Sequence, residues 1–413
     1  MRKFNPYSSL FLVYSLVSLM QSSVALAQDS IKIGAIFPLT GPNAAYGQEE
    51  KRGVDIAVRK VNEYGKVLGK KLDLIIEDDQ FKESLTISAL EKLVNRDKVV
   101  AVAGGYGSSP GLAFLAAMKN YGLPSSWEGG ATIKMDEKYG KEPWFFINHP
   151  RAPDYQEVVA KALMSIPNGP KTVAITYEDS SYGVDNFRFA EKFFAEGGLK
   201  IVLSEPFKSR ASDYAPLITK VKDVNPDIFY FICYTGDAQL IMKQAKELNY
   251  NPKMFLSTVG VALPEFETSL KKDADFVCGI EVWVPDAKYP ASREYPSLFP
   301  STDTWVKSYT DAYKREPNYW SALSYVSLVV LTNAINKARS TEPAKVISAM
   351  ESTDTMTPMG PLKYFKNSYG AIHQGFKDMI FFQWQKGKKT LLWPKSIQNG
   401  KAVYPCPPWD KRP

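Results

Sequence analysis

Histidine is scarce in this chain of 413 residues, which contains only His149 and His373. Ser-His-Asp chemistry needs a histidine positioned beside a nucleophile, and neither histidine adjoins a nucleophile motif. Metal sites need closely spaced ligands, but the sequence has no CxxC, no HExxH and no Asp-rich calcium loop. We therefore expect no catalysis, no metal ion and no cofactor.

Cysteine is almost as rare, with Cys233, Cys278 and Cys406 as the whole set. Three cysteines are too few for a disulfide scaffold in a chain of this size. Cys233 and Cys278 sit in apolar, strand-like runs, which is typical of small buried residues. In an oxidising compartment one pair could form and leave an odd thiol.

Long apolar runs are also missing, and the best candidate for a membrane segment is the stretch at residues 10–20. A membrane span takes roughly 20 apolar residues, whereas this stretch is shorter and contains serines. With Arg2 and Lys3 before it and Ala-Leu-Ala at residues 25–27 after it, it has the layout of a secretory signal. We predict a signal peptide over residues 1–27, removed after Ala27, and a periplasmic mature protein.

Neither sign of charge dominates, since the chain has 51 Lys and Arg residues and 44 Asp and Glu residues, for a formal net charge of +7. The basic residues are spread along the chain without long runs. Nucleic-acid binding would need a concentrated basic face. We therefore expect a small-molecule ligand and no nucleic-acid partner.

The pattern that is present alternates strand-like apolar runs with helical periodicity. In the first part of the chain the predicted strands and helices are 31–37, 46–64, 72–76, 84–95, 99–103 and 110–121. This βαβ order favours parallel sheets with helices on both faces. The same order begins again near residue 155, and the chain is too long for one core, so we predict two α/β lobes.

Two apolar runs in the second half predict further passages between the lobes. A strand over 276–284 would return the chain to the first lobe, and a run over 376–384 would cross again. A loop rich in proline and tyrosine covers 285–300. The tail from residue 386 follows no pattern that assigns it a role.

Several short motifs resemble the leucine/isoleucine/valine-binding proteins, extracytoplasmic receptors that deliver solutes to ABC importers. They are TGP at 40–42, YGQ at 46–48, GKKL at 69–72, EDD at 77–79 and SYG at 181–183. Together they are specific, and the resemblance covers nearly all of the chain after residue 30.

This resemblance implies a type I periplasmic binding protein with two Rossmann-like, doubly wound lobes joined by three segments. We expect residues 28–148 and 284–378 in the first lobe, and residues 149–283 and 379–413 in the second. The expected partners are a solute bound between the lobes and the permease and ATPase subunits of an ABC importer. We expect the protein itself to be a monomer.

A predicted binding turn follows the strand at 99–103. The sequence Gly-Gly-Tyr-Gly at 104–107 does not complete a dinucleotide fingerprint. Ser108 and Ser109 instead precede a helix that Pro110 can start, and hydroxyls and free amides at a helix N-terminus suit a carboxylate. An ordinary helix cap is the alternative.

The resemblance places further ligand contacts on this sequence. It implies that Ser108, Ala131 and Thr132 bind a carboxylate. It also implies that Tyr182 and Tyr234 contact the polar end of the ligand, and that Tyr46 and Trp320 line its side-chain pocket. Tyr106, after the strand at 99–103, is a further candidate because cleft aromatics combine contact area with a polar handle. Packing in the core is the alternative for each aromatic residue.

One position departs from the family pattern. Amino-acid receptors of this family place an acid where this chain has Thr258, and that acid pairs with the ammonium of the ligand. A hydroxyl cannot neutralise a buried cation, and an unpaired buried charge costs several kcal/mol. Glu128 or Glu281 could substitute. The departure favours a carboxylate-bearing ligand without an ammonium, such as an aromatic or branched organic acid.

Three alternatives stay open: an amino acid or amide ligand, a sensing module that serves a membrane receptor, and an amidase or other hydrolase. The family also carries a cystine in its first lobe. Lys82 and Gly107 occupy the corresponding region here, so that bridge is absent.

Overall fold

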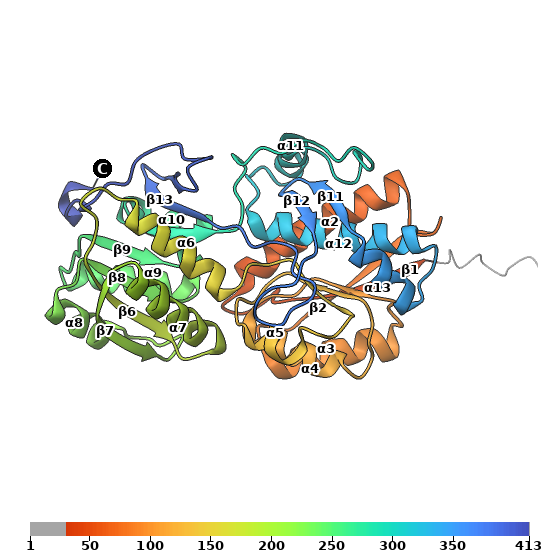
Figure 1. Cartoon of the computed structure of the whole chain (residues 1–413), viewed down its shortest axis with the longest axis horizontal. Helices are drawn as coiled ribbons and strands as arrows, with labels where there is room; N and C mark the ends of the chain where they lie inside the picture. The colour runs from red at the N-terminus through yellow and green to blue at the C-terminus, as the bar shows by residue number, and fades with distance from the viewer. Residues whose placement is uncertain (1–29, 413) are drawn as a thin grey trace, which may run out of the picture.

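Two α/β lobes lie side by side along the long axis of the molecule (Figure 1). The structure is a computed structural model that describes residues 30–412. The predicted signal peptide and its cleavage site lie outside this part of the chain.

The first lobe is built on a five-stranded parallel sheet with the order β2-β1-β3-β4-β5. Its strands are β1 (Ile31–Phe37), β2 (Leu72–Asp78), β3 (Val102–Ala103), β4 (Ser125–Trp127) and β5 (Phe145–Ile147). β1 lies inside the sheet and six of its seven residues are buried, as expected for an apolar strand covered on both faces.

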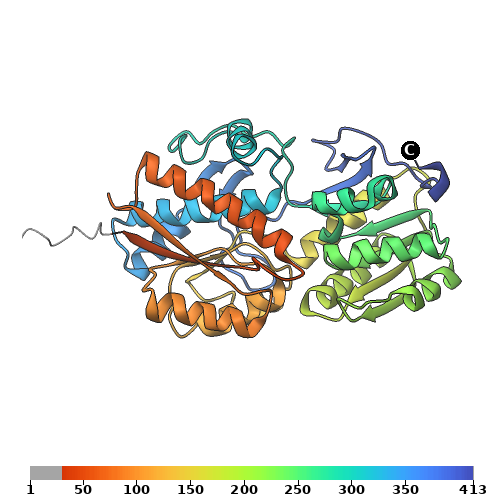
Figure 2. The ribbon, with the colours of Figure 1, turned by 180° about the vertical axis from the view of Figure 1, so that it is seen from behind.

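Helices cover both faces of this sheet (Figures 1 and 2). The helices of this lobe are α2 (Ala44–Tyr64), α3 (Glu83–Glu91), α4 (Ser108–Met118), α5 (Lys134–Tyr139), α11 (Thr302–Tyr313), α12 (Tyr319–Ala338) and α13 (Pro343–Glu351). α2 packs on α12 at very close range, because a Cβ atom at Gly53 would lie 2.1 Å from the carbonyl oxygen of Ser321. Glycine at this position allows the two helix backbones to meet.

The second lobe holds a seven-stranded sheet with the order β14-β13-β10-β9-β8-β6-β7. Its strands are β6 (Thr172–Glu178), β7 (Lys200–Phe207), β8 (Ile228–Ile232), β9 (Met254–Ser257), β10 (Cys278–Glu281), β13 (Ile380–Gln385) and β14 (Lys388–Trp393). β13 and β14 are antiparallel to their neighbours, and the others are parallel. The helices are α6 (Ala152–Met164), α7 (Ser181–Glu196), α8 (Ala215–Val224), α9 (Thr235–Glu247) and α10 (Pro264–Leu270).

The chain passes between the lobes three times: after β5, after β10, and between the hairpin strand β12 (Gly360–Lys363) and β13. β12 pairs with β11 (Asp354–Thr357) in the first lobe. This architecture confirms the predicted fold class of two doubly wound lobes with a three-segment connection.

Some predicted elements differ in length from the observed ones. The strand predicted over 276–284 is only β10, because Phe276 has a positive φ of 68° and residues 282–284 leave the sheet. β4 begins directly after Pro124, a residue that has no amide hydrogen to donate to a ladder. α4 begins at Ser108, two residues before the proline that was predicted to start it.

The tail is part of the second lobe rather than an appendage (Figure 1). β14 forms the edge of the sheet, and Trp409 near the end of the tail packs on Phe255 at 5.5 Å between ring centroids. Arg412 donates to the carbonyl oxygens of Asp273 and Asp275 at 2.7 and 3.0 Å. These contacts fasten the tail across the lobe.

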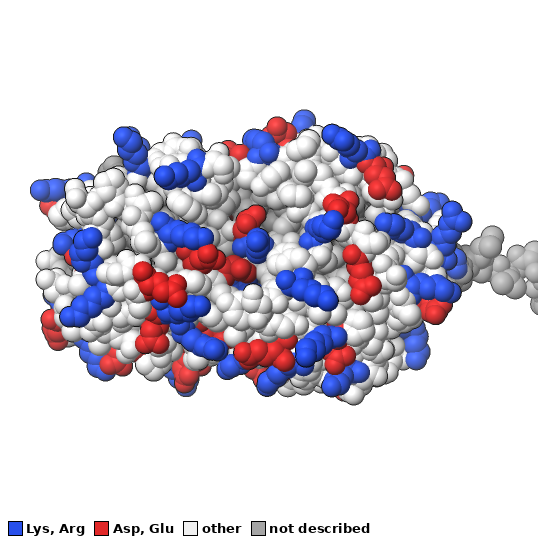
Figure 3. Space-filling model, viewed as in Figure 1, with Lys and Arg blue, Asp and Glu red and all other residues white. Residues whose placement is uncertain are grey.

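All three cysteines are buried and free. Charged side chains of both signs are interspersed over the face shown in Figure 3, as the sequence composition indicated. Within residues 30–412, no helix is both long and apolar enough to cross a membrane.

Candidate functional site

Aromatic side chains from both lobes meet where the lobes face each other. We call Tyr46, Tyr106, Tyr182, Tyr234 and Trp320 the aromatic cluster. Tyr46 stacks on Tyr106 at 4.6 Å between ring centroids, and Tyr182 stacks on Tyr234 at 5.0 Å. Tyr46 and Tyr234 approach edge to face at 5.9 Å, which joins the two pairs across the lobe boundary. Each side chain is at most 8% exposed.

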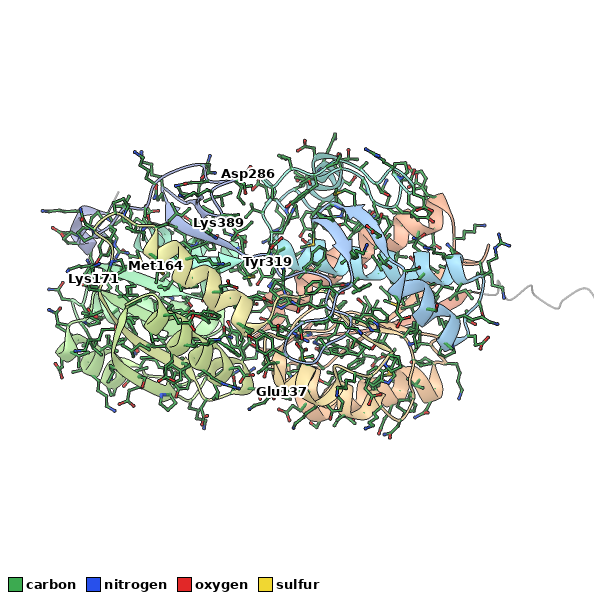
Figure 4. The ribbon with its side chains drawn as sticks, in the orientation of Figure 1. Glu137, Met164, Lys171, Asp286, Tyr319 and Lys389 are labelled. Carbon is green, nitrogen blue, oxygen red and sulfur yellow. The ribbon has the colours of Figure 1, made fainter. Side chains whose placement is uncertain are left out.

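The local fold explains why these rings converge. Tyr106 follows β3, Tyr234 follows β8, and Tyr46 lies in the first turn of α2 after β1. In open α/β sheets the loops at the carboxyl ends of the strands face the ligand crevice. Trp320 comes from the first turn of α12, and its neighbour Tyr319 lies between the two lobes in Figure 4.

Some polar atoms of the cluster are paired inside the protein. The Tyr46 hydroxyl lies 2.7 Å from the Thr235 hydroxyl and accepts a hydrogen bond from the Thr235 amide at 3.1 Å. The Tyr182 hydroxyl donates to Thr258 Oγ1 at 2.6 Å. Thr258 is therefore buried within the cluster's hydrogen-bond network, at the point where the family pattern has an acid.

Other donors of the cluster are buried and have no partner. They are the hydroxyl of Tyr106 and the indole nitrogen of Trp320, and the hydroxyl of Tyr319, next to Trp320 in α12, is likewise buried without a partner. Burial raises the pKa of both tyrosines well above the ordinary value, so their phenols stay protonated and can donate. An unpartnered buried donor is costly to the protein alone, and a ligand acceptor would relieve that cost.

A second polar contact crosses between the lobes near Ser108. Asp185 on α7 accepts hydrogen bonds from the Thr132 hydroxyl and, at 3.0 Å, from the Ile133 amide. The Thr132 amide in turn donates to Ser108 Oγ at 3.3 Å. A carboxylate of the protein itself thus occupies the Thr132 hydroxyl and the Ile133 amide.

His149 supports the cluster from the connection between the lobes. Its ring stacks on Trp320 at 5.3 Å between ring centroids, and the Tyr155 hydroxyl oxygen lies 3.3 Å from His149 Nε2. Burial lowers the pKa of His149 to about 3. The imidazole is therefore neutral near neutral pH and acts in packing.

The two acids that could replace the missing family acid lie in other environments. Glu128 is buried in the first lobe beside Glu50, and burial raises the pKa of both carboxyl groups. Glu281 forms an ion pair with Lys389 at 2.6 Å. Glu178, an acid that the sequence did not indicate, is buried at the end of β6 and lines a cavity.

A cavity of about 230 Å³ lies beside the aromatic cluster and is lined by both lobes. Its walls include Tyr182 and Tyr234 of the cluster together with Phe81, Ser109, Glu178 and Arg210. We call this space the Glu178 cavity. Two larger hollows, of about 510 and 500 Å³, are lined by no member of the cluster, so they do not mark the same site.

The structure brings together most of the residues singled out from the sequence. Ser108 and Thr132 lie at the interlobe contact with Asp185, and Ser109 lines the Glu178 cavity. Ala131 is also buried here, and its carbonyl oxygen accepts a hydrogen bond from the Ala152 amide at the start of α6.

Four residues of this region were not anticipated: Phe81, Glu178, Asp185 and Arg210. Glu178 ends β6, so its place at the carboxyl end of a strand was a signal that could have found it. Asp185 contacts a residue 53 positions away and in the other lobe, and local sequence carries no signal for such a pairing.

Comparison with known proteins agrees with this geometry. Residues 30–389 match the family model described as periplasmic binding protein. The chain belongs to this family. The periplasmic binding protein family accounts for the two-lobed fold, and it confirms the resemblance found in the sequence. It is a family of solute-binding proteins.

Individual relatives support the same placement. A Leu/Ile/Val-binding protein homolog of Brucella melitensis is 28% identical over 387 residues, which is 91% of this chain and 94% of the relative. A second relative is a branched-chain amino acid transporter substrate-binding protein of Streptococcus pneumoniae, solved with isoleucine. It has a TM-score of 0.76 at 22% identity, and the match covers 89% of this chain and 100% of the relative.

A third periplasmic binding protein carries a different ligand. This solute-binding protein of an ABC transporter from Rhodopseudomonas palustris was solved with 3,4-dihydroxybenzoic acid. It has a TM-score of 0.74 at 20% identity and covers 91% of this chain and 98% of its own. At such identities the two solved structures support the fold alone.

Proposed function

We propose that this protein is the periplasmic receptor of an ABC importer and binds a small organic acid, aromatic or branched, between its lobes. The observation that carries the proposal is the aromatic cluster, which is buried and made by both lobes. A solute held there contacts both lobes only when they are closed, so binding favours the closed state. Permease subunits would recognise that state, and the ATPase is a separate subunit.

The polar groups of the cluster favour an acid without an ammonium. Thr258 offers a hydroxyl that is already bonded to Tyr182. The unpartnered indole nitrogen of Trp320 can only donate, and the protonated hydroxyls of Tyr106 and Tyr319 can donate as well as accept. These donors suit a carboxylate, whereas a hydroxyl carries no negative charge to balance a buried ammonium. Because the Thr132 hydroxyl donates to Asp185 and the Thr132 amide donates to Ser108 Oγ, we place the ligand's carboxylate at the unpartnered donors and the Ser108 hydroxyl.

The ligands of the two solved relatives represent the two candidate ligand classes, an amino acid and an aromatic acid. One was solved with isoleucine and the other with 3,4-dihydroxybenzoic acid. The stacked rings of the cluster and the absence of an acid at Thr258 favour a ligand of the second kind. A branched-chain amino acid or an amide is the alternative ligand, and service to a membrane sensor is the alternative role.

A thermal-shift screen followed by calorimetry tests the proposal. We expect benzoate-like or branched organic acids to stabilise the protein and leucine or valine to bind weakly. Tight binding of leucine or valine with none for the acids would refute the proposal. Tyr182→Ala and Ser108→Ala should each weaken binding without unfolding the protein, and unchanged affinity in both variants would place the ligand elsewhere.

A further inference from the structure

Glu178 differs from the other acid of this cavity in that one of its two carboxyl oxygens is buried without a hydrogen-bond partner. It ends β6, is 3% exposed, and its Oε1 accepts a hydrogen bond from the Ser180 hydroxyl. Its Oε2 is buried and has no hydrogen-bond partner. A buried carboxylate oxygen without a donor is costly to the folded protein, so it marks a place where a donor from outside the chain would be favourable.

This oxygen belongs to a residue that lines the Glu178 cavity, which has room for part of a small solute. Phe81 and Ser109 of the first lobe and Arg210 of the second complete much of the wall. Because both lobes contribute, the cavity is complete only in the closed state. Tyr182 and Tyr234 line it as well as belonging to the aromatic cluster, so one ligand can reach both.

The backbone holds Glu178 in this position. α7 begins directly after it, with the Ser180 hydroxyl accepting the Gly183 amide at 3.2 Å. A Cβ atom at Gly183 would lie 2.0 Å from the Glu178 carbonyl oxygen. The glycine therefore lets the helix start tightly against the strand end that carries the carboxyl group.

The charges around the cavity favour a neutral donor over a cation. Arg210 lies over the Phe81 ring at 5.8 Å and already supplies a positive charge near Glu178. Asp237 is the other acid of the wall, and it accepts hydrogen bonds from the Arg210 amide and the Tyr214 hydroxyl. Burial raises the pKa of Glu178 to about 7, so an ammonium would meet a carboxyl group that is only partly ionised.

We propose that Glu178 accepts a hydrogen bond from a hydroxyl group of the bound acid, at the end of the ligand remote from its carboxylate. This inference rests on the proposed function and narrows it to hydroxylated aromatic acids. Glu178 is then the residue that distinguishes hydroxylated from unsubstituted ligands, while the aromatic cluster holds the ring.

Calorimetry with matched ligands tests the inference. The probes are benzoate, 3-hydroxybenzoate, 4-hydroxybenzoate and 4-(aminomethyl)benzoate, together with benzamide and 4-hydroxybenzamide as a pair without a carboxylate. We expect the wild type to bind at least one hydroxylated acid about 3- to 30-fold more tightly than benzoate, which corresponds to one hydrogen bond to a partly ionised acceptor.

Two variants and a control locate the effect. Glu178→Leu should abolish the preference for hydroxylated acids over benzoate, whereas Glu178→Gln, which keeps an acceptor, should retain part of that preference. Asp179→Asn changes the exposed neighbouring acid and should leave all affinities unchanged. The melting temperature of each variant verifies that it is folded.

The outcomes separate the inference from the proposed function. Equal affinity for benzoate and the hydroxylated acids, or a preference that survives in Glu178→Leu, would overturn the inference and leave the proposed function standing. Tightest binding by 4-(aminomethyl)benzoate would overturn the choice of a neutral donor. If no acid and no amide binds, the proposed function and the inference fall together.

Discussion

Removal of the Asp185 carboxylate should open the protein in the absence of ligand. Asp185 joins the lobes by accepting hydrogen bonds from the Thr132 hydroxyl and the Ile133 amide. In the open state water can satisfy all three groups, so Asp185→Ala destabilises the closed state selectively.

The magnitude follows from the type of bond. A hydrogen bond to a charged acceptor contributes about 1.5–3 kcal/mol. Asp185→Ala removes two such bonds, but it also removes the cost of desolvating the carboxylate, and this offsets part of the loss. A net cost of about 2–4 kcal/mol to the closed state shifts the closing equilibrium about 30- to 700-fold. The apparent affinity for any ligand of the closed state should fall as that state becomes rarer.

Distance measurement between spin labels on the two lobes checks this prediction. Glu83 and Ser212 are exposed positions near Phe81 and Arg210, on opposite sides of the cleft. The native cysteines are buried, so cysteines introduced at these positions should react selectively. Asp185→Ala should lengthen the mean distance, while Glu191→Ala, an exposed acid on the same helix, should not.

An unchanged distance distribution in Asp185→Ala would refute the reasoning about this contact. A gain in affinity for acids would also contradict it. That result would mean that Asp185 competes with the ligand's carboxylate for Thr132 instead of holding the lobes together.

Three further predictions concern other parts of the chain. Tyr46→Phe removes the hydroxyl that contacts Thr235 in the other lobe and should weaken ligand binding by about 1 kcal/mol in calorimetry; unchanged affinity would show that this bond does not support closure. Arg412→Ala should lower the free energy of unfolding in urea by about 2–3 kcal/mol, because the side chain fastens the tail, whereas exposed Lys411→Ala should have no effect. Burial and the nearby Glu128 raise the pKa of Glu50, so its contribution favours the fold at low pH and is lost as pH rises past the ordinary value of 4.5 toward the folded pKa. Glu50→Gln should therefore raise the melting temperature at pH 8 and have little effect at pH 4, and the reverse order would contradict the assignment.

The fold could be predicted from sequence because its signals are local. β1 and β8 are short apolar runs rich in β-branched and aromatic residues. A ring of the aromatic cluster follows each strand where the next helix begins, Tyr46 in the first turn of α2 and Tyr234 just before α9. Position at the carboxyl end of a strand was enough to suggest that such rings face the crevice.

The interlobe contacts could not be predicted, because they depend on how the lobes meet. Asp185 is one of several polar residues on α7, and nothing in its neighbourhood indicates Thr132 as its partner. Glu178 ends a strand as many acids do, and only the three-dimensional structure reveals its unpartnered oxygen. The tail likewise has no periodic pattern, since single contacts such as that of Arg412 with Asp273 hold it.

A crystal structure of the protein with a bound hydroxybenzoate tests the account most directly. We expect the ring between the lobes, in contact with Tyr182 and Tyr234, with its carboxylate on donors of the cluster and its hydroxyl at Glu178. A compound bound outside the interlobe space, or an α-amino acid whose ammonium pairs with Glu178, would contradict the account.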